Sequence, residues 1–256
     1  MIRDKRTFIK LKFEDSFLEK KFQIYYSKKN LSIFRYSVIL GAMTILLFSF
    51  VDIWALPVTF LSAIKIRFIF AIPILSFVIF LSLKENFYKY LDVALISSGL
   101  VASLIICKII QQSKAVETGY DNYYSGILLI NVWMSTFVRS RFRPALISVL
   151  LNTLSYLCVA VFFQDYLTSQ NPERIMVFYT NLSFLISTSF IVVVACRDFE
   201  VYARNEFLQN IILKLDNQAL IEKENKLKQQ QSRMVDASRL AAVGEMAAGI
   251  AHEINN

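Results

Sequence analysis

The sequence predicts an all-α membrane protein: a bundle of six transmembrane helices followed by a long cytoplasmic helix of the coiled-coil type. Three observations lead to this prediction. Hydrophobic residues make up 55% of the 256 residues, and the mean hydropathy is +0.47. These values lie above those of ordinary soluble domains. The apolar residues gather in long runs, and the last part of the chain is instead polar and rich in helix formers.

The six predicted spans follow from length. Crossing about 30 Å of hydrocarbon takes on the order of 20 mainly apolar residues. Six stretches reach or approach that length: 36–56, 67–83, 91–110, 124–138, 144–163 and 175–196. The fourth stretch is the shortest. Together they define a membrane domain over residues 36–196.

The basic residues predict the orientation of the bundle. A cluster of cations precedes the first span: Arg3, Lys5, Arg6, Lys10, Lys12, Lys20, Lys21, Lys28, Lys29 and Arg35. Arg139, Arg141 and Arg143 crowd the turn between the fourth and fifth spans. Basic loops stay in the cytoplasm, so residues 1–35 form a cytoplasmic segment and both termini are cytoplasmic. Lys65 and Arg67 are exceptions, which we expect in the first outer loop.

The net charge of +8 is explained by the same distribution. The cations lie next to apolar segments, where anionic lipid head groups attract them. We therefore expect membrane lipids as partners and no nucleic acid. The glycines form no phosphate-binding loop, and the three cysteines lie in or beside apolar runs with one histidine in the whole chain, so we expect no bound nucleotide and no metal site.

The polar stretch 197–237 is predicted to be one signalling helix, because it contains neither proline nor glycine. A seven-residue repeat of apolar residues marks the seam of a coiled coil, and a homodimer is the expected product. The repeat comprises Leu213, Leu220, Leu227, Met234 and Ala241. Intervening seam positions are polar at Asn217, Glu224 and Gln231, so the seam is weak. A solvated helix without a partner is the alternative.

A second apolar stripe begins one residue out of phase with that seam. It comprises Leu240, Val243, Ala247, Ile250 and Ile254. The lone histidine, His252, falls on the opposite side of this helix and is expected to face water. The surrounding string, "SRLAAVGEMAAGIAHEINN" over residues 238–256, resembles the phosphoacceptor box of the sensor histidine kinases of bacterial two-component systems.

The resemblance implies a chemistry for three residues. His252 would attack the γ-phosphorus of ATP, since a neutral imidazole needs no deprotonation first. Glu253 would serve as acid and base at the other ring nitrogen, and Asn256 would assist dephosphorylation. The family further implies a response regulator as partner. ATP and Mg²⁺ would be bound only by a catalytic domain that this chain lacks, so the chain alone is expected to be an incomplete, inactive kinase in the bacterial inner membrane.

The membrane region has a resemblance of its own, to the six-helix domain that precedes some bacterial adenylate cyclases and histidine kinases. The strings that carry it are "FVDIWALP", "IKIRFIFAIP", "YYSGILL", "RSRFRPAL" and "RDFEVYARNEF". In that family the domain is regarded as a receptor, commonly of unassigned ligand. A cyclase output is disfavoured here because the linker leads into the phosphoacceptor string.

Polar residues near the outer surface are candidates for a ligand site. Asp52 and Arg67 are placed to pair, and Asp121 and Asp165 fall in neighbouring outer loops, where they would complete an acidic site for a cation or polar ligand. Loop solvation and helix packing are the alternative explanation. Asn131, Asn152 and Asn181 are expected to form hydrogen bonds between helices. The competing function is a small six-helix transporter or ligand-binding membrane protein without enzymatic output.

Overall fold

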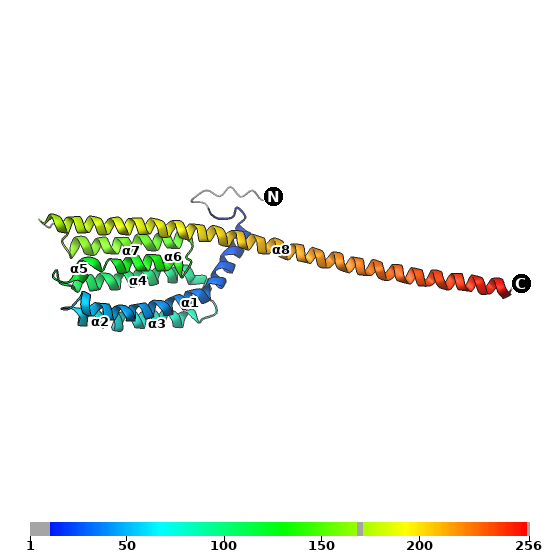
Figure 1. Cartoon of the computed structure of the whole chain (residues 1–256), viewed down its shortest axis with the longest axis horizontal. Helices are drawn as coiled ribbons and strands as arrows, with labels where there is room; N and C mark the ends of the chain where they lie inside the picture. Colours follow the sequence, from blue (N-terminus) through cyan, green and yellow to red (C-terminus); the bar gives the residue numbers. More distant parts are fainter. Residues whose placement is uncertain (1–10, 168–170, 255–256) are drawn as a thin grey trace. The chain divides into compact units, whose positions relative to one another are not determined.

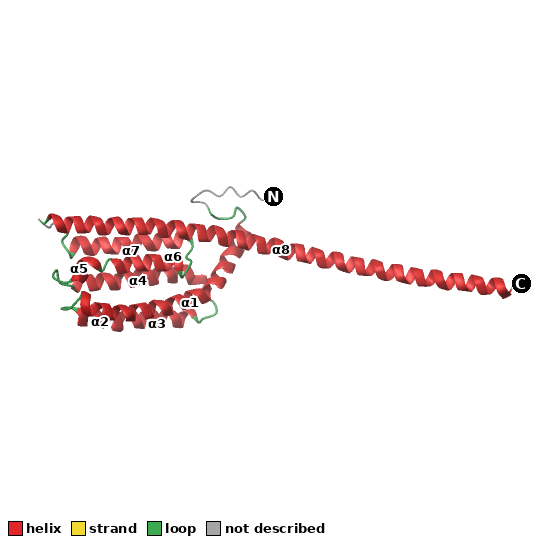
Figure 2. Cartoon of the chain, in the orientation of Figure 1, coloured by secondary structure: helices red, strands yellow, loops and turns green. Residues whose placement is uncertain are grey.

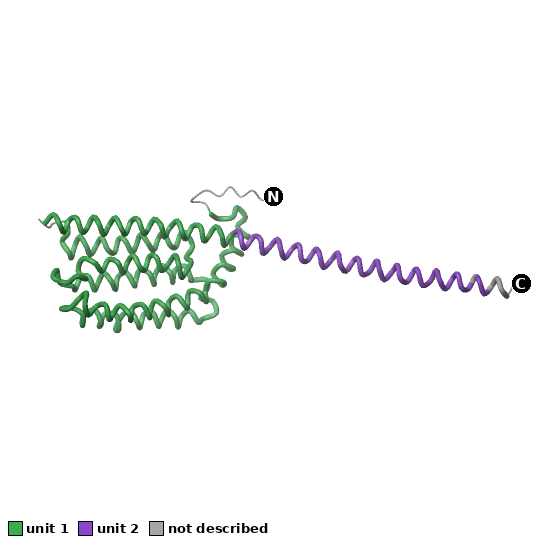
Figure 3. Tube along the Cα trace, in the orientation of Figure 1, with its two compact units in different colours: residues 1–204 green, residues 205–256 purple. Residues whose placement is uncertain are grey.

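The computed structural model describes residues 11–167 and 171–254; within the last turns, the side chains of residues 248 and 251–254 are excluded. The described residues are helical and contain no strand (Figure 2). The chain divides into two compact units, residues 1–204 and residues 205–256 (Figure 3). The predicted all-α class is therefore confirmed.

The first unit is built from helices that run alongside one another (Figure 1). Their bounds are α1 Ser16–Ala55, α2 Phe60–Ile66, α3 Ile72–Ser82, α4 Leu91–Gln112, α5 Thr118–Asn122, α6 Ser125–Thr136 and α7 Phe142–Phe162, with the first part of α8, Pro172–Ile254. A short 3-10 helix, Phe87–Tyr90, precedes α4. The most extensive contact joins α4 and α7, which places these two helices at the centre of the unit.

Several helices are long and apolar enough to cross a membrane. Among the described residues five helical segments meet that condition: Ser16–Ala55, Phe60–Ser82, Phe87–Gln112, Phe142–Phe162 and Pro172–Ala247. The predicted fourth span corresponds to α6, which has only 12 residues. At 1.5 Å per residue, α6 is about 18 Å long, short of the hydrocarbon thickness. The long apolar helices are thus confirmed, and a six-span bundle stays a prediction.

Two helices begin earlier in the chain than the spans predicted within them. Helix α1 begins at Ser16, where the Asp15 side chain caps it by accepting a hydrogen bond from the Phe17 amide at 2.9 Å. Part of the predicted N-terminal segment is therefore the start of α1. The second helical segment begins at Phe60, so Lys65 lies within a helix and not in a loop, whereas Arg67, the first residue of the predicted span, is helical as that span requires. No residue between Phe60 and Arg67 breaks a helix.

A π-helical turn, Arg67–Ala71, joins α2 to α3. The amide of Ile72 donates to the carbonyl of Arg67, a bond that spans one residue more than in an α-helix. Pro73 follows at the start of α3 and has no N–H to donate. The altered turn rotates Arg67 relative to the α3 side chains, and the Arg67 guanidinium is buried.

The loops of the first unit lie at its two ends, as their hydrogen bonds show. At one end, Glu117 binds the α1–α2 loop, and the side chain of Gln164, after α7, donates to the Tyr120 carbonyl at 2.6 Å. At the other end, the Tyr26 hydroxyl donates to the Arg139 carbonyl, and the Phe142 amide donates to Glu200 at 2.9 Å. Alternate connections therefore lie at opposite ends, as repeated crossing of a layer requires.

The second unit consists of α8 alone. Its helix continues to Ile254, which confirms the predicted single helix over the described part of the C-terminal stretch. Every side chain from Ile212 to Ala247 is exposed, including the predicted seam, where Leu220 is 62% and Leu227 is 64% exposed. Ion pairs between residues four apart, such as Lys226 with Glu222 at 2.8 Å, add support along the helix surface.

Candidate functional site

The structure brings Asp52 and Arg67 together in a buried ion pair. The Arg67 guanidinium donates from Nε to Asp52 Oδ2 at 2.7 Å and from Nη2 to Oδ1 at 2.9 Å. The Tyr123 hydroxyl donates to the same carboxylate, so α1, the π-helical turn and the residue after α5 meet at one group. Asp52 is 0% and Arg67 is 4% exposed. This two-point geometry fixes both charges and leaves no net charge at the site.

A second buried carboxylate, Glu117, lies at the same end and holds the α1–α2 loop. Its oxygens accept from the amides of Val58 and Thr59 at 2.9 and 2.8 Å, and from the Lys114 amide at 2.7 Å. The Thr59 hydroxyl also donates to it. Burial by itself raises the pKa of Glu117, and these donors outweigh burial, so the pKa lies below its ordinary value. Glu117 was not singled out in the sequence, because a lone loop glutamate carries no pattern.

The other two residues of the predicted acidic site lie apart from that pair in their contacts. Asp121 accepts a hydrogen bond from the Tyr166 hydroxyl, and its carbonyl accepts from Asn181 Nδ2 at 3.0 Å. Burial and the bond to Asp121 raise the pKa of Tyr166. Asp165 has a positive φ of 51° in the loop after α7. Among residues 11–167 and 171–247 no three His, Cys, Asp or Glu side chains are grouped to hold a metal ion.

The predicted polar contacts in the middle of the bundle are present. Asn152 Nδ2 donates to Asn131 Oδ1 at 2.8 Å, which links α7 to α6. The hydroxyls of Ser103 and Ser155 lie 2.7 Å apart and link α4 to α7. Together with the bond from Asn181, these contacts confirm interhelical hydrogen bonding as the role of the three asparagines. The bond between Asn152 and Asn131 satisfies one atom of each amide, whereas Asn131 Nδ2 and Asn152 Oδ1 are buried without a hydrogen-bond partner among the described residues.

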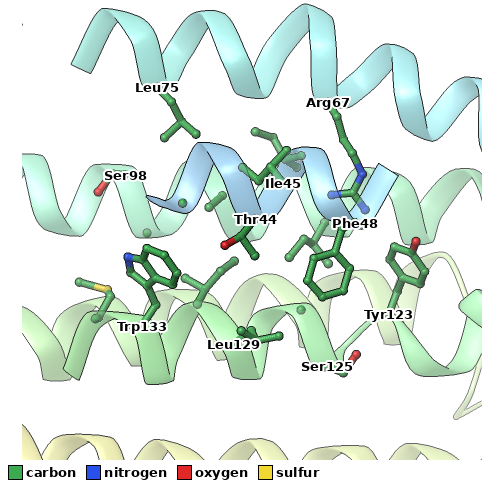
Figure 4. Close-up of a pocket in the computed structure, with 18 of the residues that line it drawn as sticks. Thr44, Ile45, Phe48, Arg67, Leu75, Ser98, Tyr123, Ser125, Leu129 and Trp133 are labelled. Carbon is green, nitrogen blue, oxygen red and sulfur yellow. The ribbon is translucent and has the colours of Figure 1, made fainter. Parts of the chain in front are cut away.

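An apolar cavity of about 280 Å³ lies between α1, α3, α4 and α6 (Figure 4). Arg67 and Tyr123 lie toward one end and Trp133 toward the other, with Phe48 and Leu129 between them. The size approaches the lower bound of about 300 Å³ for small-molecule pockets.

At the opposite end of the unit, Arg204 of α8 joins a polar cluster with Glu19 and Glu200. The guanidinium donates to both oxygens of Glu19, at 2.7 and 3.1 Å, and to Glu200 Oε1 at 2.7 Å. The rings of Phe13 and Phe22 lie 5.0 and 4.2 Å from its Cζ. Arg204 is 1% exposed. We call these five residues the clasp. Glu200 and Arg204 belong to the string "RDFEVYARNEF" noted in the sequence, but no local pattern predicts their contact with residues 13–22, which are far away along the chain.

The predicted phosphoacceptor residues lie at the end of the second unit. His252 and Glu253 belong to the helical backbone of α8, and Asn256 falls outside the described residues. Nearby, Ile250 of the apolar stripe is 56% exposed. No family model, no curated protein and no solved structure was found to match this chain.

Proposed function

We propose that the chain is the membrane sensor part of a two-component histidine kinase. In this proposal a stimulus acts on the membrane bundle, α8 carries the change to residues 238–256, and His252 accepts phosphate from ATP bound by a catalytic domain. The phosphate then passes to a response regulator. The protein lies in the bacterial inner membrane as a homodimer, with both termini in the cytoplasm.

The observation that carries the proposal is the continuity of α8. One helix, Pro172–Ile254, includes an apolar segment long enough to span a membrane and the residues that resemble a phosphoacceptor box. A helix resists bending over such a length when no proline or glycine interrupts it, and the first glycine after Pro172 is Gly244. A shift or rotation of the membrane segment is therefore passed along the helix axis.

The exposed seam supports dimerisation as part of the mechanism. Leucines that are about 60% exposed along one line of a helix gain free energy when a second copy covers them. The polar positions between them limit that gain, so the pairing is weak enough to change register. In such a dimer a change in helix register moves His252 toward or away from the ATP-binding domain.

A ligand-binding membrane protein without enzymatic output is the second candidate function. The cavity between α1, α3, α4 and α6 favours it, because ligand sites of membrane proteins are commonly enclosed by helices. Both functions accommodate the bundle, and they differ in whether His252 is phosphorylated.

Phosphorylation of membranes separates the two candidates. Membranes of cells that make the protein from its own gene are incubated with ATP labelled at the γ-phosphate. We expect an acid-labile, alkali-stable label on the protein, which His252→Gln abolishes. Glu245→Gln, two turns earlier on α8, is the matched control and keeps the label. Absence of label from the wild-type protein, or equal label in His252→Gln, contradicts the proposal.

A further inference from the structure

We propose that the cavity between α1, α3, α4 and α6 binds one aliphatic chain, with an uncharged hydrogen-bonding group as its preferred head. This inference concerns the first unit alone and does not rest on the kinase proposal. It starts from the lining, which is formed by apolar side chains such as Ile45, Phe48 and Leu129 (Figure 4). Water gains few hydrogen bonds in such a space, whereas hydrocarbon fills it favourably.

The cavity is maintained by small residues where helices would otherwise interlock. Gly41 of α1 faces Trp133 of α6, and a Cβ placed on Gly41 would meet the indole at an ordinary contact distance of 3.7 Å. Ala102 of α4 also lines the space. Because these positions carry little or no side chain, they leave unfilled the volume that a larger side chain would take from the cavity.

Side-chain contacts join the helices at both ends of the cavity, so the helices cannot move together and fill it. At one end Asp52, Arg67 and Tyr123 bind one another. At the other end Phe34 of α1 stacks on Phe87 with ring centroids 5.9 Å apart, within a buried apolar cluster. A site for an elongated molecule is expected to have this arrangement: contacts between helices at two ends and an apolar space between them.

The charges at the tied end decide the preferred head group. The single negative charge of Asp52 and the single positive charge of Arg67 cancel, so neither a carboxylate nor an ammonium finds a free counter-ion there. The lining hydroxyls of Thr44, Ser98 and Ser125 donate to the carbonyls of Leu40, Leu95 and Asn122, respectively. Their lone pairs remain free, and an alcohol that donates a hydrogen bond suits them.

Two sources supply an aliphatic chain inside a membrane: a phospholipid of the bilayer, or a free long-chain alcohol. The two tryptophans allow them to be distinguished. Trp133 lines the cavity, whereas Trp54 is 78% exposed. In a Trp54→Phe background Trp133 is the sole tryptophan, and bromine on a nearby chain quenches its fluorescence. The protein is placed in nanodiscs of chain-brominated phosphatidylcholine, or in nanodiscs of unbrominated lipid titrated with ω-bromododecanol.

The informative variant is Thr44→Phe, which fills the cavity. Its matched control is Met43→Phe, whose side chain is 57% exposed and lies outside the lining. We expect saturable quenching by ω-bromododecanol, weaker quenching by ω-bromododecanoate, and a half-saturation raised roughly tenfold in Thr44→Phe, because each excluded methylene costs about fourfold in affinity. Met43→Phe should behave like the parent protein.

Sensitivity to Thr44→Phe with ω-bromododecanol supports the proposal. Sensitivity seen only in brominated phosphatidylcholine shows that a lipid chain occupies the cavity, and its charged head group contradicts the proposed preference. Equal quenching in Thr44→Phe and Met43→Phe with both probes overturns it, since the bromine then reaches Trp133 from the surrounding lipid. Circular dichroism verifies folding. If Thr44→Phe loses helicity, Ala102→Leu, which fills the same cavity from α4, replaces it and the same comparison decides.

Discussion

At the scale of single residues, the ion pair of Asp52 and Arg67 is the contact on which the fold depends most clearly, because both charges are buried. Both side chains are almost fully inaccessible, and the carboxylate also accepts from Tyr123. Removing one charge leaves the other buried without compensation. The pair is therefore important to the fold whether or not a ligand binds nearby.

We expect Asp52→Asn to lower the free energy of unfolding by about 3 to 5 kcal/mol, the usual cost of breaking a buried pair. Unfolding in detergent micelles by SDS titration measures it. Asp198→Asn is the control, because Asp198 pairs with Arg197 at 2.7 Å while its side chain is 64% exposed. The control should change stability by less than about 1 kcal/mol. Equal effects of the two substitutions would show that burial does not strengthen the dependence on Asp52.

The Glu117 carboxylate predicts a pH dependence. Its pKa is lowered in the folded protein, so its contribution is complete above the ordinary pKa of 4.5 and is lost as pH falls through the lower, folded value. Glu117→Gln should cost about 1 to 3 kcal/mol at neutral pH, with a difference from the parent that shrinks in acid. Glu85→Gln, in another loop and exposed, is the control. A difference that stays constant from neutral to acid pH would refute this role.

At the scale of elements, the clasp connects the start of α1 to α8. Arg204 reaches Glu19, Glu200 and two aromatic rings, so the position of α8 in the first unit depends on residues near the beginning of the chain. A double-mutant cycle of Glu19→Gln and Arg204→Met should give a coupling free energy of about 1 to 3 kcal/mol. The cycle of Glu222→Gln and Lys226→Met, an exposed pair, should give less than about 0.5 kcal/mol. Similar coupling free energies in both cycles would show that the clasp stabilises the protein no more than an exposed ion pair does.

The seam of α8 gives a second prediction for an element. Leu227→Lys should weaken self-association of the protein in detergent by about tenfold or more, since a buried leucine is worth about 1.5 to 3 kcal/mol. Mass photometry over a dilution series measures the dissociation. Gln229→Lys adds the same charge two residues away from the seam and should leave association nearly unchanged. An equal loss in both variants would favour charge repulsion over the proposed seam.

The sequence predicted the helices more completely than the contacts between them. Long apolar runs and a long stretch without proline identified the helices, because both signals are local. The second helical segment begins at Phe60, earlier than the predicted span, because Lys65 was read as a loop cation. The sequence did predict that Arg67 pairs with Asp52, but no local pattern indicates the π-helical turn in which Arg67 lies. Likewise, Glu117 and the clasp depend on contacts between residues far apart in sequence.

At the scale of the whole molecule, the proposed function requires His252 to lie on the side of the membrane where ATP is found. The loops of the first unit alternate between two ends, basic residues crowd the turn around Arg139, Arg141 and Arg143, and α8 leads out of the apolar segment into a polar helix. These features favour a bundle in the membrane with a cytoplasmic helix that carries the phosphoacceptor.

Limited trypsin digestion of sealed vesicles tests this arrangement most directly. The sites are the exposed cations of the second unit, among them Lys214, Lys223 and Arg233. In inside-out vesicles we expect rapid cleavage at these sites, which leaves a membrane-protected fragment that contains the first unit. In right-side-out vesicles the second unit should stay intact until detergent is added. Cleavage of the second unit in sealed right-side-out vesicles, or release of the whole protein by alkaline carbonate, would contradict the account.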